Sequence, residues 1–141
     1  MPKRSDITPR DLKDFLRNIG LFERMRENPS SYLIRLVGTG LTQLTGHVTG
    51  KTFQESVPAD FLPRYTESCD LVLDGGKPLR FVGRVHLNGH EYLDAEHLYT
   101  PLADDNGRPA YVMGLFRYTQ IHSSHEDSWA SQIASIPADL L

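Results

Sequence analysis

The chain has 141 residues, of which 39% are hydrophobic and 23% are charged, and this composition is ordinary for one globular domain. Its formal net charge is −3 at pH 7. Nucleic-acid binding needs a concentrated face of Lys and Arg side chains. The densest basic run here is Lys3-Arg4 near the N-terminus, so we expect no nucleic-acid partner.

Cys69 is the single cysteine, so the chain cannot form an internal disulfide. The N-terminal residues lack the apolar stretch that a secretion signal requires. No segment approaches the ~20 apolar residues that cross a membrane. These features favour a cytoplasmic protein that does not insert into membranes.

The N-terminal residues are typical of an amphipathic helix. Thr8 can cap such a helix, Pro9 suits its first turn, and Asp11 can complete a capping box. Apolar residues then recur at helical spacing up to Gly20, which would end the helix. These residues are Leu12, Phe15, Leu16 and Ile19. We expect this stripe either to cover the chain's own sheet or to form a homodimer interface.

The next segment predicts two strands, at 21–26 and 31–37. Both faces of the second strand are apolar apart from one Arg, which suggests a strand that is covered on both sides, or nearly so. Short helical turns follow over 39–57. A longer helix is expected at about 59–74, because Phe61, Tyr65, Cys69 and Val72 share one face and Gly75-Gly76 ends it.

The apolar period changes to two after this helix, which predicts strands. Asn88-Gly89 is a strong signal for a tight hairpin, and Asp104-Asp105-Asn106-Gly107 predicts the next turn. The three strands are expected at 79–87, 91–102 and 110–119. Consecutive strands with a helical insertion indicate an antiparallel α+β domain.

Three groups of residues carry a family resemblance. They are Arg4–Leu12, then Tyr32–Thr39 with Thr45-Gly46 and Thr49–Lys51, and finally Glu96–Leu102 with Asp105–Gly107 and Met113-Gly114. In this order, and with these elements, they resemble a bacterial PAS-domain family often found as short stand-alone proteins. The resemblance implies a five-stranded antiparallel sheet with helices on one face and an N-terminal helix. We expect a PAS-like domain at 1–120 and a C-terminal extension at 121–141.

The pairing of the first hairpin decides which residues face the helices. If Asn88-Gly89 is a two-residue turn, Phe81 pairs with Glu96 and Arg80 with His97. Glu96 would then lie on the apolar face, as a polar anchor in a pocket or as half of a buried ion pair, with Arg117 as a candidate partner. A bulge that turns Glu96 and Asp94 outward is the alternative.

The usual cofactor chemistries lack their residues. Flavin-binding photoreceptor PAS domains use a Cys in an Asn-Cys-Arg-type motif, which is absent around Cys69. No His lies in the long helix to ligate haem, and His86, His90 and His97 do not converge on one metal ion in the expected register. A catalytic site would need a His and an Asp in a pocket, for which His90 and Asp94 are loose candidates. We therefore expect no cofactor, no metal and no enzymatic activity.

The resemblance implies sensing, signalling or partner binding. Our first hypothesis is a sensory module that binds an unidentified small molecule and signals to a partner protein. The alternative is an adaptor or dimerisation module without a ligand. Pocket candidates are Tyr32, Ile34, Phe61, Tyr65, Cys69, Phe81, Tyr92, Glu96, Leu98 and Arg117.

Overall fold

A computed structural model describes residues 1–84 and 93–120 of the chain. The strands are β1 (Ile19–Arg24), β2 (Tyr32–Val37), β3 (Leu79–Arg84), β4 (Leu93–Ala103) and β5 (Pro109–Gln120). Over the described residues they form one antiparallel sheet in the order β2-β1-β5-β4-β3. The α-helices are α1 (Thr39–Thr45), α2 (Phe53–Ser56) and α3 (Leu62–Gly75).

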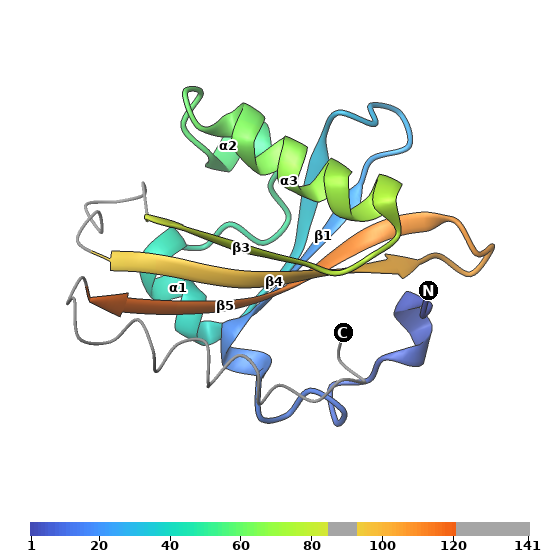
Figure 1. Cartoon of the computed structure of the whole chain (residues 1–141), viewed down its shortest axis with the longest axis horizontal. Coiled ribbons are helices and arrows are strands. Elements are labelled where there is room, and N and C mark those ends of the chain that lie inside the picture. Colours follow the sequence, from blue (N-terminus) through green and yellow to red (C-terminus); the bar gives the residue numbers. More distant parts are fainter. Residues whose placement is uncertain (85–92, 121–141) are drawn as a thin grey trace.

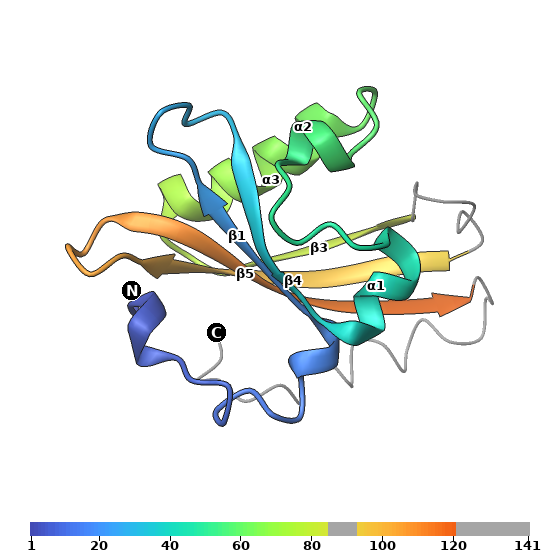
Figure 2. The ribbon, with the colours of Figure 1, turned by 180° about the vertical axis from the view of Figure 1, so that it is seen from behind.

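The sheet has two differently covered faces. Helices α2 and α3 lie over one face, called the inner face below, and the N-terminal segment crosses the opposite or outer face (Figures 1 and 2). The expected α+β fold, with a five-stranded antiparallel sheet and helices on one face, is therefore confirmed.

Helix α3 follows its local sequence signals closely. Pro63 lies in the first turn, where its missing N–H interrupts no helical hydrogen bond. The helix ends at Gly76, which adopts φ 66° and donates from its N–H to the carbonyl of Val72. Glycine adopts this left-handed conformation without steric penalty. Cys69 and Val72 are fully buried on the face that α3 turns to the sheet.

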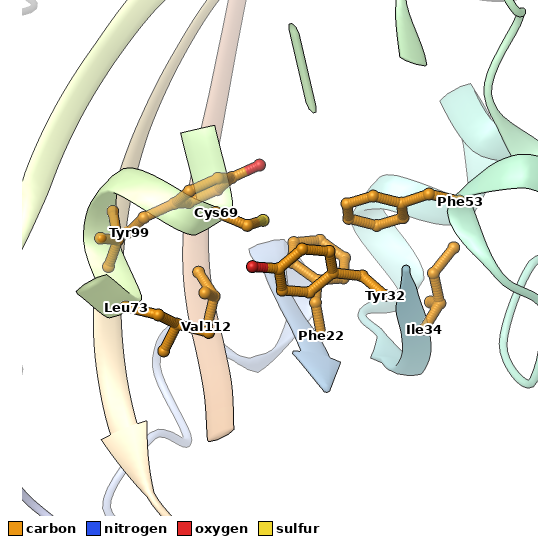
Figure 3. Close-up of a cluster of buried hydrophobic side chains, with 9 residues drawn as sticks. Phe22, Tyr32, Ile34, Phe53, Cys69, Leu73, Tyr99 and Val112 are labelled. Atoms are coloured by element: carbon orange, nitrogen blue, oxygen red, sulfur yellow. The ribbon is translucent and has the colours of Figure 1, made fainter. Parts of the chain in front are cut away.

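The main hydrophobic core lies between α3, α2 and the inner face (Figure 3). Phe53 from α2 stacks on Tyr32 from β2, with ring centroids 5.4 Å apart, and meets Phe22 from β1 edge-on at 5.1 Å. The buried members of this core are Phe22, Tyr32, Ile34, Phe53, Cys69, Val72, Leu73, Tyr99 and Val112. The core thus joins strands from both halves of the chain to the helical layer.

The predicted N-terminal helix is wrong. Asp11 and Thr8 do exchange hydrogen bonds as a capping box would. However, residues 9–15 form successive turns with i→i+3 bonds, and only Arg4–Asp6 and Leu16–Asn18 are short 3-10 helices. The reason is that Ile19 already belongs to β1, where it pairs with Leu115 of β5.

The apolar stripe of the N-terminal segment packs on this chain's own sheet. Leu12 and Ile19 are 7% and 2% exposed in an outer-face cluster with Leu21, Leu102 and Met113. The burial of these side chains was thus predicted correctly. The N-terminal helix that was expected to carry them, on the sheet or at a homodimer interface, is not formed.

Strand β2 is not covered on both sides, contrary to expectation. Leu36 is 40% exposed and Arg35 is exposed as well. The outer edge of β2 is instead covered by the loop before α2, since Ile34 exchanges backbone hydrogen bonds with Gly50 and Lys51.

Several expectations lie outside the described residues. These are the Asn88-Gly89 turn, the positions of His86, His90 and Tyr92, and the extension at 121–141. Among the described helices, none is long and apolar enough to cross a membrane.

Candidate ligand-binding site

Two glycines opposite each other shape the floor of the inner face. Gly20 of β1 pairs with Gly114 of β5. A Cβ atom on Gly114 would lie 2.7 Å from the ring of Phe116 and 2.8 Å from that of Tyr99, and one on Gly20 would lie 2.9 Å from the ring of Phe22. Because neither glycine has a side chain, three aromatic rings lie directly over the sheet backbone.

These rings form one wall of a cavity of about 200 Å³ between the sheet and the helices. Helices α1 to α3 and the segments between them supply the other walls. The lining residues are Gly20, Phe22, Ile34, Val37, Leu41, Thr45, Val48, Phe53, Ser56, Val57, Arg64, Tyr65, Ser68, Phe81, Val82, Gly83, Ala95, His97, Tyr99, Phe116 and Tyr118. Among the described lining residues, Arg64 is the one that is charged at neutral pH, and it is exposed.

His97 lies in a row of rings that crosses three strands. It pairs with Phe81 of β3 on one side and with Phe116 of β5 on the other. The ring centroids are 5.3 Å and 5.2 Å away, with interplanar angles of 22° and 31°. Burial lowers the pKa of His97 to about 4, so its imidazole is neutral at physiological pH. Its Nδ1 atom is buried and has no hydrogen-bond partner within the described structure.

Ser56 supplies a second buried polar atom from the opposite side of the cavity. It is the last residue of α2, whose start is fixed by the capping box between Thr52 and Glu55. The Ser56 Oγ has no hydrogen-bond partner among the described residues. Buried polar atoms of native proteins nearly always have one, so Ser56 and His97 are two lining residues whose buried polar atoms a bound molecule could satisfy, while Glu96 Oε2 is a third such atom on the outer face.

Three tyrosines in the lining remain protonated at neutral pH. Burial raises the pKa of Tyr65, Tyr99 and Tyr118 above the ordinary value of a phenol. Their hydroxyl groups are therefore uncharged, and the cavity combines apolar walls with neutral polar groups.

A cluster of four residues beside the cavity fastens α3 to the sheet; we call it the α3 clamp (Arg24, Tyr32, Asp70 and Asp74). The Tyr32 hydroxyl donates to Asp70 Oδ1 at 2.5 Å and accepts from Arg24 Nε at 3.2 Å. Arg24 also contacts Asp70 and Asp74, each at 3.0 Å. Burial, followed by the hydrogen bond to Asp70, raises the pKa of Tyr32. The clamp thus holds α3 against both β1 and β2.

The observed register corrects the expected position of Glu96. Phe81 pairs with His97, and Glu96 pairs with Val82 and with Arg117. This pairing differs by one residue from the expected one, and a shift of one residue exchanges the two faces of a strand. Glu96 and Leu98 therefore lie on the outer face, away from the cavity.

Glu96 is nevertheless fully buried and ion-paired. Its Oε1 accepts from Arg80 Nε, and the Arg80 side chain is about half exposed at 49%. The expectation of an ion pair that includes a buried Glu96 thus holds, and Arg80 supplies a cationic partner. Arg117 is the residue directly opposite Glu96 on β5.

The remaining pocket candidates are distributed as follows. Ile34, Tyr65 and Phe81 line the cavity. Tyr32 and Cys69 lie in the core beside it, and neither they nor Phe61 belong to its lining. Whether any of these residues binds a ligand stays a prediction.

Sequence reasoning missed the residues that give the cavity its polar character. His97 was assigned to the outer face by the wrong register, and nothing in the sequence around Ser56 marks it out. The glycines did carry a signal, because glycine inside a strand often indicates close packing against the backbone. Among the described residues, no three His, Cys, Asp or Glu side chains group as a metal site would require.

A five-stranded antiparallel sheet with short helices and a cavity on one face is an α+β architecture. A family model for the PAS domain matches residues 1–117, and the chain belongs to the PAS domain family. Comparison with curated proteins gives no match.

Solved structures share this fold. The PAS domain of Bordetella pertussis BvgS is 16% identical, with 89% of this chain and 99% of that chain covered and a TM-score of 0.56. The Rhodobacter sphaeroides LOV protein is 17% identical over 90% of this chain and 77% of that one, with a TM-score of 0.56. VqmA, in the Vibrio cholera VqmA-ligand-DNA complex, is 11% identical over 94% of this chain and 60% of that one, with a TM-score of 0.60. At these identities the likeness concerns the fold alone.

Proposed function

We propose that this PAS domain is a non-catalytic sensory module of bacterial signalling, which binds a small molecule in the inner cavity and acts on a partner protein. One observation carries the proposal: an apolar cavity of about 200 Å³ is lined by His97 and Ser56, and each of these residues has a buried polar atom without a protein partner among the described residues. A ligand with a polar group could supply a hydrogen-bond partner to such an atom, as buried polar groups require.

The walls of the cavity suggest how binding reaches the surface. Tyr65 and Ser68 belong to α3, and Phe81, His97 and Phe116 belong to the sheet. A ligand between these layers would change how α3 packs on the sheet, provided that it binds one packing arrangement more tightly than the other. Leu71, which is 60% exposed on α3, would carry such a change to a partner.

The same residues favour binding over catalysis. An imidazole whose pKa is lowered to about 4 is a weak base at neutral pH. The described lining contains no carboxylate that could act with it. Cys69 is fully buried, and burial raises the pKa of its thiol, so it is not an activated nucleophile. A cytoplasmic location is part of this proposal, since the chain has one cysteine and cannot form an internal disulfide.

Native mass spectrometry of the purified protein tests the proposal directly. We expect a reproducible mass above that of the polypeptide, which disappears when the same sample is denatured. A protein that carries no extra mass, and whose cavity amides show no NMR shift with any extract of its host cell, would contradict ligand binding.

The second candidate is an adaptor that acts only through protein contacts. Strand β3 lies at the edge of the sheet and exposes Val82 (64%) and Leu79 (38%). Edge strands offer unpaired backbone groups to another chain. Sedimentation velocity over a range of concentrations distinguishes this candidate, because self-association through β3 should weaken when Val82 is replaced by Lys.

A further inference from the structure

The described lining of the cavity restricts the chemistry of what it can hold. We infer that the cavity takes a neutral, planar aromatic molecule of one or two rings, whose polar group hydrogen-bonds to His97 and Ser56. This inference rests on the proposed function and adds the ligand class to it.

Size sets the first limit. A cavity of about 200 Å³ is somewhat larger than the cavity of about 150 Å³ that accommodates benzene in another protein. It is smaller than the roughly 300–1,000 Å³ of typical pockets for drug-sized ligands. One ring with a substituent, or two fused rings, therefore fills it.

The sheet side of the cavity provides a wall for a flat molecule. Phe81, His97 and Phe116 are direct neighbours across β3, β4 and β5, and their planes differ by only 22° and 31°. Tyr118 continues this row, with its ring 13° from the plane of Phe116. Aromatic rings pair favourably with one another in offset-stacked or edge-to-face geometry, so an aromatic ligand gains contacts here that an aliphatic one does not.

The charges around the cavity disfavour an ionised ligand. The described lining contains no Asp or Glu that could pair with a cation. Arg64 belongs to the lining but is an exposed residue, so its charge stays in contact with solvent. His97 is buried and neutral. An ion moved from water into this site would lose its hydration without a buried counter-charge, which is unfavourable.

The two unpaired polar atoms select a group that can both donate and accept. His97 Nδ1 comes from β4 in the sheet, and Ser56 Oγ comes from the end of α2 in the helical layer. A serine hydroxyl can donate or accept, and the Nδ1 of a neutral imidazole does one of the two according to its tautomer. An amide or a hydroxyl group on the ligand can both donate and accept, so it matches either atom whichever tautomer is present.

Benzamide, benzoate and benzamidine test this inference as a matched set. The three have the same planar shape and are neutral, negative and positive, respectively, near pH 7. Each is titrated into isotope-labelled protein, and the backbone amide shifts of cavity residues such as Gly20, Tyr65 and Ala95 are followed by NMR. We expect benzamide to bind at least about tenfold more tightly than either ion, because of the unpaired charge that the ions would bury.

Variants of the two polar residues then test the hydrogen bonds. His97→Phe keeps a ring in the row, and Ser56→Ala removes one hydroxyl group. Each should weaken benzamide about fivefold to tenfold, as expected for the loss of one hydrogen bond. Toluene, which has no polar group, serves as the control, and its affinity should not fall in either variant. Melting curves verify that both variants are folded. Each substitution tests one of the two proposed hydrogen bonds to the ligand, so the two results are independent.

The outcomes separate this inference from the proposed function. If benzoate or benzamidine binds the cavity as tightly as benzamide, or if both variants bind benzamide unchanged, the ligand class is wrong while small-molecule binding stands. If none of the three probes nor toluene shifts the cavity amides, the aromatic ligand class is overturned, and native mass spectrometry decides separately whether the proposed small-molecule binding stands.

Discussion

The Tyr32 hydroxyl donates a hydrogen bond to Asp70 Oδ1 over 2.5 Å and so joins β2 to α3. The same carboxylate oxygen accepts from Arg24 of β1. The ring of Tyr32 is fully buried and stacks on Phe53, so the polar end and the apolar body of one side chain fix two different helices. This arrangement limits how far α3 can move when the neighbouring cavity is filled.

Tyr32→Phe should destabilise the fold. It removes a hydrogen bond to a charged group, which contributes about 1.5–3 kcal/mol, and leaves the ring packing intact. The measurement is the free energy of unfolding in urea. Tyr111→Phe is the matched control, because the Tyr111 hydroxyl has no hydrogen bond to a described residue, and it should change stability by less than about 0.5 kcal/mol. Equal effects of the two substitutions would contradict a role for the α3 clamp.

His97 should make stability depend on pH. Its pKa is about 4 in the folded protein against an ordinary value of 6.5. Between these values the unfolded chain binds a proton that the folded chain does not, so stability is complete above pH 6.5 and falls as the pH drops toward 4. The loss over that interval is up to about 3 kcal/mol.

Urea unfolding of wild type and His97→Phe at pH 7.5 and pH 5 measures this contribution. The loss of stability between the two pH values should be smaller in the variant. His47→Phe, at an exposed histidine, should retain the wild-type difference. A His97→Phe protein with the full wild-type pH dependence would show that this imidazole titrates normally.

Gly114→Ala should destabilise the protein by about 1–3 kcal/mol through overpacking. The new methyl group would lie within 2.7–2.8 Å of the rings of Phe116 and Tyr99, which must then move. Gly83→Ala is the matched control within the same sheet, since nothing lies within 4 Å of its Cβ position. Thermal melting compares the two variants, and a stable Gly114→Ala protein would indicate that the aromatic wall is easily displaced.

Arg80→Met should reveal the buried charge of Glu96. The substitution removes the cationic partner Arg80 from a fully buried carboxylate, and we expect a loss of about 2–3 kcal/mol, less than for a pair buried at both ends. In a Glu96→Gln background the same substitution should cost less than about 1 kcal/mol. Additive effects in this double-mutant cycle, measured by urea unfolding, would rule out a coupling between the two side chains.

The sequence predicts most of the elements because their signals are local. Gly76 ends α3 through its own conformation. The alternation of apolar and polar residues predicts β3 and β5 as strands, whichever strands they pair with. The N-terminal segment differs, since Leu12 and Ile19 satisfy a helical pattern and a sheet-packing pattern equally well. Their burial was predictable, but the choice of backbone conformation depends on the pairing of Ile19 with β5.

The candidate site was harder to predict than the fold. The faces of β4 depend on the number of residues in one turn, and an error of one placed Glu96 inside and His97 outside. Ile34, Tyr65 and Phe81 were assigned correctly to the cavity side. They lie on β2, α3 and β3, where the apolar periodicity of each element defines its buried face without reference to the register of β4. Ser56 becomes recognisable only when α2 is folded over the sheet.

The order of strands also constrains how the chain can fold as it is synthesised. β1 lies between β2 and β5 in the sheet. Ile19 of β1 pairs with Leu115 of β5, and most of the chain separates these two residues in the sequence. The β1-β2 pair can form early, but the centre of the sheet closes only after β5 has left the ribosome. Until then the apolar inner side of β1 has no β5 beside it. Because β1 and β5 are far apart in the sequence, their pairing should make folding comparatively slow. Nascent chains that stall before β5 are therefore the ones that we expect to depend on chaperones.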